Sequence, residues 1–126
     1  MSGDNYLLDT NIVLYISNGN EDLKSFLNHQ RMTISAISEI ELLSFHSITK
    51  KEIAGLTSFI EEMEVVSVDD KIKNIAIAVR RKYKLKLPDS IIAATSIAYG
   101  IPLITADKQF RFVEELQLLL YDNTNK

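Results

Sequence analysis

Apolar residues follow two different periods along the chain, and the changes between them divide the sequence into elements. Short runs rich in Leu, Ile and Val, bounded by polar residues, are typical of buried strands. They predict five strands, at residues 6–8, 32–35, 65–68, 101–105 and 116–121. Segments in which apolar residues recur every three or four positions predict helices at residues 9–16, 21–30, 37–45, 50–62, 70–83, 88–99 and 107–112.

Residues typical of helix ends support this division. Asp69 precedes one helical segment as an N-cap would, and Ser35 or Ser38 caps another. Pro88 suits a first helical turn, and Gly100 suits a helix end. Because strands alternate with helices throughout, we predict an α/β fold with three layers, α/β/α. Its central sheet is expected to be mostly parallel, with about five strands.

Length and composition exclude several kinds of protein. With 126 residues, of which 46% are apolar and 25% charged, the chain is expected to form one globular domain over residues 1–126. It has no cysteine, which excludes disulfides and thiolate zinc sites. His29 and His46 are the only histidines, which excludes a His-rich metal site and argues against a Ser/His/Asp triad.

The sequence predicts neither a targeting segment nor a membrane span. The N-terminal residues carry no basic cluster, and the apolar stretch after them is interrupted by Asp9 and Asn11. No apolar run approaches the roughly 18–20 residues that span a bilayer. We therefore expect a cytoplasmic protein that has no membrane partner.

Four acidic residues fall where a parallel sheet would bring them to one edge. Asp9 and Asp107 follow predicted strands directly, while Glu41 and Asp89 are expected in the first turns of helices. In open parallel sheets, ligands bind beyond the carboxyl ends of the strands. Glu41 is also the one charge within the apolar run from residue 40 to 43, as expected of a side chain directed at the rim of the sheet.

Each acid also has a purely structural interpretation. Asp9 and Asp107 would both serve as N-caps of the helices that follow them. Asp89, directly after a proline, would complement the positive end of a helix dipole. Glu41 would be an ordinary solvated helix residue, or Glu39 would be the functional acid in its place. The functional interpretation therefore depends on all four acids meeting.

Clustered carboxylates repel one another unless cations compensate. A set of hard oxygen ligands without Cys or His suits Mg²⁺ or Mn²⁺, as one or two ions. Such a site activates water and neutralises charge on a phosphate, so the predicted reaction is hydrolysis of a phosphodiester. Asn11, Ser38 and Thr105 are candidate supporting groups that orient the carboxylates or a bound water, although all three also suit capping roles.

Four segments resemble, in order and spacing, the acidic motifs of the PIN-domain family and more narrowly of its VapC-type toxin branch. They are LLDTN at 7–11, ISAISEIEL at 34–42, LPDSIIAA at 87–94 and LITADKQF at 103–110. Carried over residue by residue, the resemblance makes Asp9, Glu41, Asp89 and Asp107 the metal ligands and catalytic residues. In the family the second acid follows a Ser or Thr by three residues, which favours Glu41, three after Ser38, over Glu39.

The resemblance implies a Mg²⁺- or Mn²⁺-dependent endoribonuclease that is the toxin of a type II toxin–antitoxin pair. Its substrate would be tRNA, rRNA or mRNA. Such toxins form homodimers and are inhibited by a cognate antitoxin whose tail enters the active-site groove. The net charge of −3 does not exclude RNA, because without the four candidate ligands 13 of the 17 acids remain against 14 bases.

Two further surfaces have open interpretations. A basic stretch before Asp89 either gathers RNA phosphates, with Tyr83 available for stacking, or is a solvated helix end; it comprises Arg80, Arg81, Lys82, Lys84 and Lys86. A set of apolar residues either forms an antitoxin groove or dimer face or belongs to the core; it comprises Val13, Leu14, Tyr15, Leu42, Leu43 and Phe45.

Other functions fit the sequence less well. A catalytically silent RNA- or protein-binding module of the same fold would have no reason to keep four clustered acids. A phosphatase of the haloacid dehalogenase type would need a second Asp two residues after Asp9, where Asn11 stands. A receiver domain would need an acidic pair near the first strand, and Asp4 is too early for that, although Lys108 matches superficially.

Overall fold

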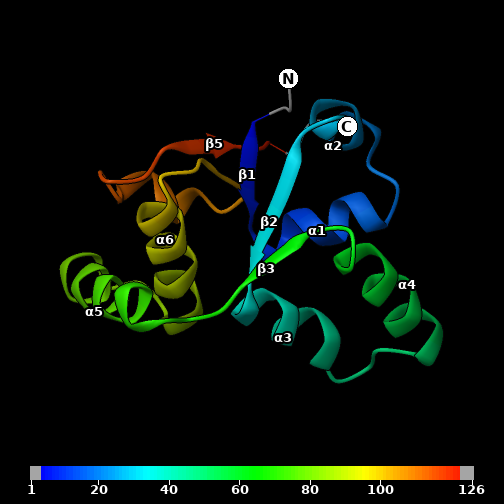
Figure 1. Cartoon of the computed structure of the whole chain (residues 1–126), viewed down its shortest axis with the longest axis horizontal. Coiled ribbons are helices and arrows are strands. Elements are labelled where there is room, and N and C mark those ends of the chain that lie inside the picture. Colours follow the sequence, from blue (N-terminus) through cyan, green and yellow to red (C-terminus); the bar gives the residue numbers. More distant parts are fainter. Residues whose placement is uncertain (1–3, 123–126) are drawn as a thin grey trace.

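The computed structural model describes residues 4–122, and its centre is a parallel sheet of five strands (Figure 1). The strands are β1 (Asn5–Leu8), β2 (Arg31–Ser35), β3 (Glu64–Val66), β4 (Leu103–Thr105) and β5 (Leu118–Leu120). They lie in the order β3-β2-β1-β4-β5, and every neighbouring pair is parallel. The predicted α/β fold with a parallel central sheet is therefore confirmed.

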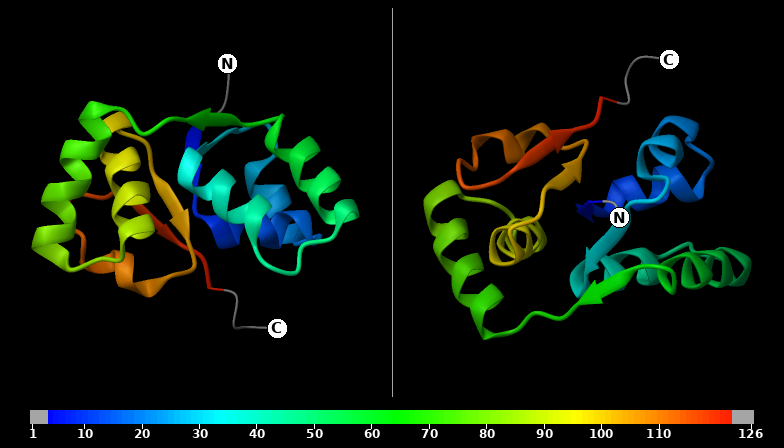
Figure 2. Two further views of the ribbon diagram at one scale, coloured as in Figure 1. Left: turned by 90° about the horizontal axis from the view of Figure 1, so that it is seen from below. Right: turned by 45° about the horizontal axis from the view of Figure 1, so that its top comes forward.

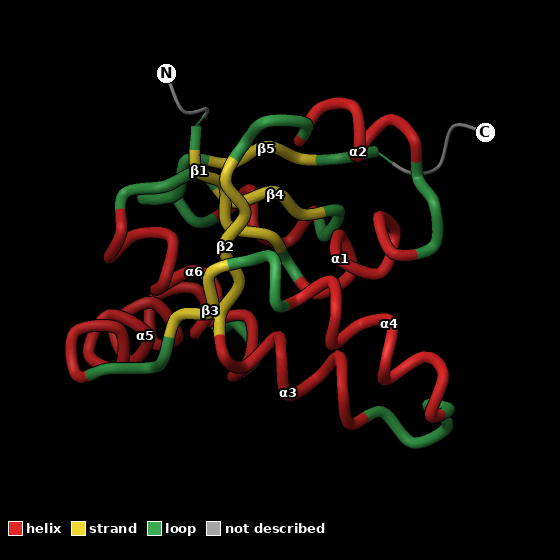
Figure 3. Tube along the Cα trace, turned by 45° about the vertical axis from the view of Figure 1, so that its right-hand side comes forward, coloured by secondary structure: helices red, strands yellow, loops and turns green. Residues whose placement is uncertain are grey.

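Helices cover both faces of this sheet. They are α1 (Thr10–Ser17), α2 (Glu21–Leu27), α3 (Ala36–Ser44), α4 (Lys50–Ile60), α5 (Asp70–Tyr83), α6 (Leu87–Tyr99) and the 3₁₀ helix η1 (Lys108–Phe112). The strands run between α5 and α6 on one side and α1 and α4 on the other (Figure 3). A view from below shows the same separation, with α3 between the two groups (Figure 2, left).

The alternation of side chains along β1 explains the two layers of the core. Leu7 and Leu8 are both completely buried, but they enter different clusters. Leu7 packs with residues of α5, α6 and η1, whereas Leu8 packs with residues of α1, α2 and α4. Successive side chains of a strand point to opposite faces, so the central strand supplies apolar residues to both layers.

Several predicted boundaries were too wide, for identifiable reasons. The fourth strand begins at Leu103 and not at residue 101, because Pro102 has no N–H for a strand ladder; its carbonyl still accepts from the Leu7 N–H at 2.8 Å. The third strand ends at Val66, and the following residues lead to Asp69, which caps α5. The helix predicted at residues 21–30 ends at Leu27, because His29 adopts a left-handed backbone with φ 68°.

The helix-end signals are largely confirmed. Ser35, not Ser38, caps α3, and Gly100 ends α6 with φ 64°. Within residues 4–122, no helix has the length and apolar character that crossing a membrane requires.

The strand order reverses between β1 and β4, because the chain adds strands on one side of β1 first and on the other side later. That point is where an open α/β sheet offers a crevice.

Candidate active site

Asp9 stands at the carboxyl end of the central strand and is almost completely buried, with 7% of its surface exposed. Its Oδ1 accepts from the Thr10 N–H at 2.8 Å, which makes it the N-cap of α1. Its Oδ2 accepts from the Thr105 hydroxyl at 2.6 Å, across the strand switch point from β4. Asp9 is therefore a helix cap and a crevice residue at once, because each role uses a different oxygen.

Glu41 lies in the second turn of α3 and not in the first turn as predicted, because it is the sixth residue of the helix that begins at Ala36. Its Oε1 is 2.7 Å from the Thr10 hydroxyl oxygen, which is also 3.0 Å from the Ser38 hydroxyl oxygen. A carboxylate accepts only, and a hydroxyl has one hydrogen. Thr10 therefore donates to Glu41 and accepts from Ser38, which is completely buried.

Asp89 and Asp107 come from the other side of the switch point. Asp89 is in the first turn of α6, after Pro88, and is partly exposed. Asp107 caps η1, because its Oδ1 accepts from the Gln109 N–H at 2.9 Å. The Asp107 N–H in turn donates to the Thr105 hydroxyl at 3.0 Å, so Thr105 connects the backbone of Asp107 to the carboxylate of Asp9.

All four acids line a single pocket of about 420 Å³. The other residues that line it are Thr10, Asn11, Leu14 and Phe45. Glu39, the alternative to Glu41, is not among them. Asn11 is exposed at the pocket wall, while Ser38 and Thr105 lie beneath it and act through hydrogen bonds to Thr10 and Asp9.

Thr10 is the residue that reasoning from the sequence missed. Among the described residues, the Thr10 hydroxyl makes the only direct hydrogen bond between α1 and the Glu41 carboxylate. The signal was a hydroxyl residue placed immediately after the strand-end acid, where it occupies the first position of a helix. Thr105 was predicted to orient Asp107; its hydroxyl accepts from the Asp107 N–H, but the carboxylate to which it donates is that of Asp9.

The carboxylates in the pocket repel one another. Burial raises the pKa of Asp89 to about 6, and repulsion from Asp9, Asp107 and Glu41 adds to it, while nearby Lys86 opposes the rise. Burial also raises the pKa of Asp9, against the lowering effect of its hydrogen bonds from Thr105 and Thr10. A cation in the pocket would relieve this repulsion.

The donor set fits a hard divalent cation, because four carboxylates and no His or Cys line the pocket. The four carboxylates do not converge on one point, however. Across residues 4–122, no three acidic or histidine side chains form a group close enough to hold a metal ion. Hydrogen bonds from Thr10, Thr105 and the Gln109 N–H orient three of the four acids separately. Binding a cation would therefore require these side chains to move inward.

Comparison with known proteins identifies the family. The model of the PIN domain matches residues 6–116. The chain belongs to the PIN domain family. The predicted resemblance is thereby confirmed, and no curated protein matches the chain.

Solved structures with the same fold are similar over almost the whole chain of this PIN domain. A structure of VapBC2 from Rickettsia felis bound to a promoter DNA fragment has a TM-score of 0.82 at 24% identity, covering 94% of this chain and 99% of the other. A toxin-antitoxin complex from Klebsiella pneumoniae has a TM-score of 0.77 at 28% identity, with 90% and 95% covered. DNA-bound VapBC from Salmonella typhimurium has a TM-score of 0.82 at 22% identity, with 91% and 96% covered. This PIN domain thus shares its fold with VapC-type chains.

The basic stretch of this PIN domain is divided among three environments. Lys82 forms an ion pair with Glu115 at 3.2 Å, and the Tyr83 hydroxyl donates to the same carboxylate at 2.6 Å, so Tyr83 is already engaged. Lys86 precedes α6 and acts on Asp89. The other three cations, Arg80, Arg81 and Lys84, line a separate groove.

The apolar residues singled out in the sequence also divide. Val13 and Leu42 are buried in the core, and Tyr15 and Leu43 pack against it. Leu14 and Phe45 line the acidic pocket, and 41% of Phe45 is exposed. Core packing therefore accounts for most of the set, and two members give the pocket an apolar wall.

Proposed function

We propose that this PIN domain is a metal-dependent endoribonuclease that hydrolyses RNA phosphodiester bonds. The observation that carries the proposal is the meeting of four carboxylates, from segments almost a hundred residues apart, in one pocket at the strand switch point. Family membership supports it. The raised pKa of Asp89 supports it too, because perturbed acids in a cleft are typical of functional sites.

In the proposed mechanism, Asp9, Glu41, Asp89 and Asp107 would hold one or two Mg²⁺ or Mn²⁺ ions. When bound there, such ions would supply activation of a water molecule and neutralisation of charge on the phosphate. Thr105 and Thr10 orient the carboxylates of Asp9 and Glu41 by donating hydrogen bonds to them. Asn11, at the pocket wall, is placed to orient the attacking water or an RNA oxygen.

Lys86 is the member of the basic stretch that we propose contacts RNA close to the reacting phosphate, because its charge already acts on Asp89. The remaining cations, Arg80, Arg81, Lys82 and Lys84, would contribute at longer range to attraction of the RNA backbone. The proposed substrate is tRNA, rRNA or mRNA, as the family resemblance implies.

We further propose that the protein is a cytoplasmic toxin, that it forms a homodimer, and that it is inhibited by a cognate antitoxin. Structures that share its fold include toxin–antitoxin complexes. An inhibitory segment with a basic group for the carboxylates and an apolar group for Leu14 and Phe45 would match the pocket.

The decisive test is cleavage of a labelled RNA in Mg²⁺ or Mn²⁺, with EDTA as one control. Asp9→Asn and Asp89→Asn should each lose activity by at least about a hundredfold, the scale of losing a strong electrostatic contribution. The exposed acid Glu62, on the turn after α4, provides the matched control, and Glu62→Gln should cleave like wild type. Cleavage that survives EDTA and both Asn variants would overturn the proposal.

A catalytically silent binding module is the second candidate, and the observation in its favour is that the acids are not gathered into a cation-binding group in residues 4–122. The two functions separate on Mn²⁺ binding. A nuclease should show a raised melting temperature in millimolar Mn²⁺, and Asp89→Asn should shift less. No shift in wild type, together with RNA binding without cleavage, would establish the silent module.

A further inference from the structure

Helix η1 connects Asp107 of the acidic pocket to an exposed aromatic residue. Its sequence is KQFRF, and a 3₁₀ helix has three residues per turn, so side chains three positions apart lie on the same face. Phe110 and, one turn later, Val113 are buried in the core. The other four residues of η1 are exposed. The core therefore holds η1 by one face and leaves its other faces open to a ligand.

The exposed faces of η1 combine positive charge with an aromatic ring. Lys108 and Arg111 share one face, and Gln109 and Phe112 share another. Phe112 is 63% exposed, the highest value among the large apolar residues described. The Arg111 guanidinium carbon lies 5.0 Å from the centre of the Phe112 ring, within the range of a cation–π contact. Because most of Phe112 stays exposed beside this guanidinium, a second flat group can stack on the ring.

This surface lies at the same end of the sheet as the acidic pocket. Asp107 lines the pocket and caps η1, and at about 2 Å per residue Phe112 follows on the order of 10 Å farther along. After η1, Glu115 accepts from the hydroxyl of Tyr83, the last residue of α5. The segment from η1 onward therefore runs beside the joint between α5 and α6 that leads to Asp89 (Figure 2, left).

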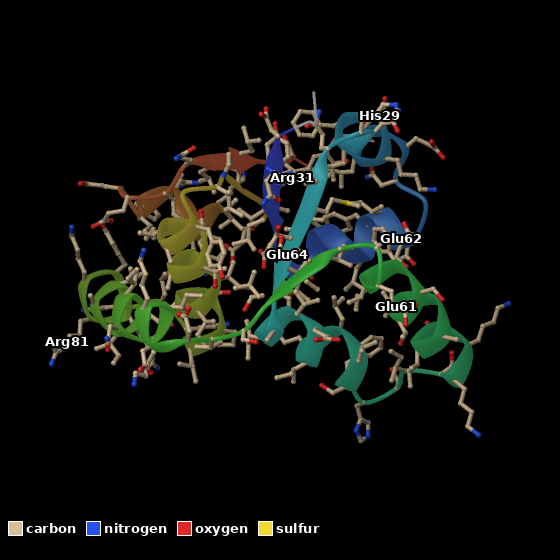
Figure 4. The ribbon with its side chains drawn as sticks, viewed as in Figure 1. His29, Arg31, Glu61, Glu62, Glu64 and Arg81 are labelled. Atoms are coloured by element: carbon tan, nitrogen blue, oxygen red, sulfur yellow. The ribbon has the colours of Figure 1, made fainter. Side chains whose placement is uncertain are left out.

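The charge around η1 favours a polyanion. Helix η1 contains two cations and no acid, and of the two acids that follow it, Glu115 is already paired with Lys82. The acids Glu61, Glu62 and Glu64 lie near α4 and β3, away from η1 (Figure 4). Strand β3 is one edge of the sheet, and η1 packs against β5, which is the other edge. A phosphate chain that enters the acidic pocket over η1 thus meets cations first.

We infer that Phe112 and the two cations of η1 form a subsite for one unpaired base of the RNA and its neighbouring phosphates. The base stacks on the Phe112 ring, and Lys108 and Arg111 contact phosphates between that base and the scissile bond. A base inside a duplex is stacked on its neighbours, so its face is not available to a side chain. The subsite therefore selects RNA that is single-stranded within a few nucleotides of the cut. This inference deepens the proposed ribonuclease and rests on it for the substrate.

The first test is RNA binding at low salt in EDTA, where metal-dependent cleavage is suppressed. The probe is a fluorescently labelled single-stranded oligoribonucleotide of mixed sequence, compared with the same strand annealed to its complement. Phe112→Ala should bind the single strand about tenfold more weakly, within the range for stacking aromatic residues, and bind the duplex as wild type does. Phe112→Trp should retain the wild-type affinity, because it keeps a ring for stacking.

Tyr99 provides the matched control. It is an aromatic residue with 50% exposure, and it ends α6 at the opposite end of that helix from Asp89. Tyr99→Ala should bind both probes as wild type does, and circular dichroism should show all variants folded. A wild type that does not bind the single strand would overturn the inference. An equal loss for single strand and duplex in Phe112→Ala would overturn it too.

A strand of the same length that lacks its bases tests stacking directly. Wild type should bind it about tenfold more weakly than the normal strand, and Phe112→Ala should cause no further loss, because both changes remove the same contact. Losses that simply add would overturn the stacking. Lys108→Gln and Arg111→Gln should each lower the slope of log affinity against log salt by about one, and unchanged slopes would overturn the phosphate contacts.

Cleavage in Mn²⁺ is measured in parallel with binding. Phe112→Ala should raise KM for the single-stranded substrate about tenfold and leave kcat nearly unchanged, because the ring lies outside the acidic pocket. Wild type that cleaves RNA with the same KM as Phe112→Ala would contradict the subsite alone. Wild type that loses affinity in the Phe112→Ala variant but cleaves no RNA would contradict the nuclease alone.

Discussion

Replacing Thr10 with Val tests whether a single hydroxyl holds Glu41 in the acidic pocket. Valine keeps the shape of threonine and keeps the backbone N–H that Asp9 accepts from, so only the hydroxyl is lost. A hydrogen bond to a charged acceptor contributes about 1.5–3 kcal/mol, and the partly exposed Glu41 favours the lower end. The completely buried Ser38 hydroxyl also loses its partner, which costs about 1 kcal/mol or more.

The variant should therefore be less stable by about 2–3 kcal/mol without metal, a fall in melting temperature on the order of 6–10 °C for a domain of this size. Its affinity for Mn²⁺ should fall by roughly 10–100-fold, the usual effect of removing a group that orients a ligand. Calorimetric titration with Mn²⁺ and thermal unfolding in EDTA measure the two effects separately.

Thr10→Ser is the matched control, because it retains the hydroxyl and should keep most of the Mn²⁺ affinity. A purely structural role would lower the melting temperature and leave Mn²⁺ affinity unchanged. If Thr10→Val binds Mn²⁺ as wild type does, or if Thr10→Ser is equally impaired, the positioning role assigned to the hydroxyl is wrong.

Three further results are expected. Because the folded-state pKa of Asp89 is raised from 3.8 to about 6, its ionisation destabilises the metal-free fold as pH rises through that window. Asp89→Asn should therefore be more stable than wild type at pH 8, by about 1 kcal/mol after allowing for solvent screening, and equal to it below pH 4. Urea unfolding in EDTA at both pH values measures the difference in unfolding free energy. The same difference at both pH values would contradict the prediction. Mn²⁺ affinity should fall by about tenfold per pH unit below pH 6 as protons compete for the same carboxylate, which titration between pH 5 and 7 would detect; a flat profile would exclude Asp89 as a ligand. Phe110→Ala should cost about 3–5 kcal/mol in urea unfolding, because Phe110 is 1% exposed in the core beneath α6, and a loss below 1 kcal/mol would mean that this layer tolerates a cavity.

The fold followed from the sequence because its periodic signals are strong. The runs at β1 and β4 are apolar on both faces, since Leu7 and Leu8 face different layers, and such runs are typical of buried parallel strands. Once the strands were assigned, Asp9 and Asp107 fell at carboxyl ends, and the parallel order predicted that they would meet. What the pattern did not supply was the length of each strand, because Pro102 and the cap at Asp69 end the ladders locally.

The details of the site depended on three-dimensional contacts that no period records. The Thr105 hydroxyl donates to Asp9 and not to the side chain of its near neighbour Asp107, because β1 and β4 are adjacent strands. The basic residues are nearly continuous in the sequence, yet Lys82 pairs with Glu115 while Arg81 lines a groove, because successive residues of a helix face different directions. The sequence shows which chemical group each residue carries, but it does not show which other residue that group contacts.

The position of β1 between β2 and β4 has a consequence for the order of events during synthesis. The hydrogen bond from Thr105 to Asp9 joins residues 96 positions apart, so the crevice cannot close until nearly all of the described chain has been made. Pairings over such long separations also form late in folding. A growing chain can thus complete β1, β2 and β3 while its central strand still has one open edge. If the proposed ribonuclease activity resides in the acidic pocket, this arrangement delays assembly of the pocket until β4 has been translated.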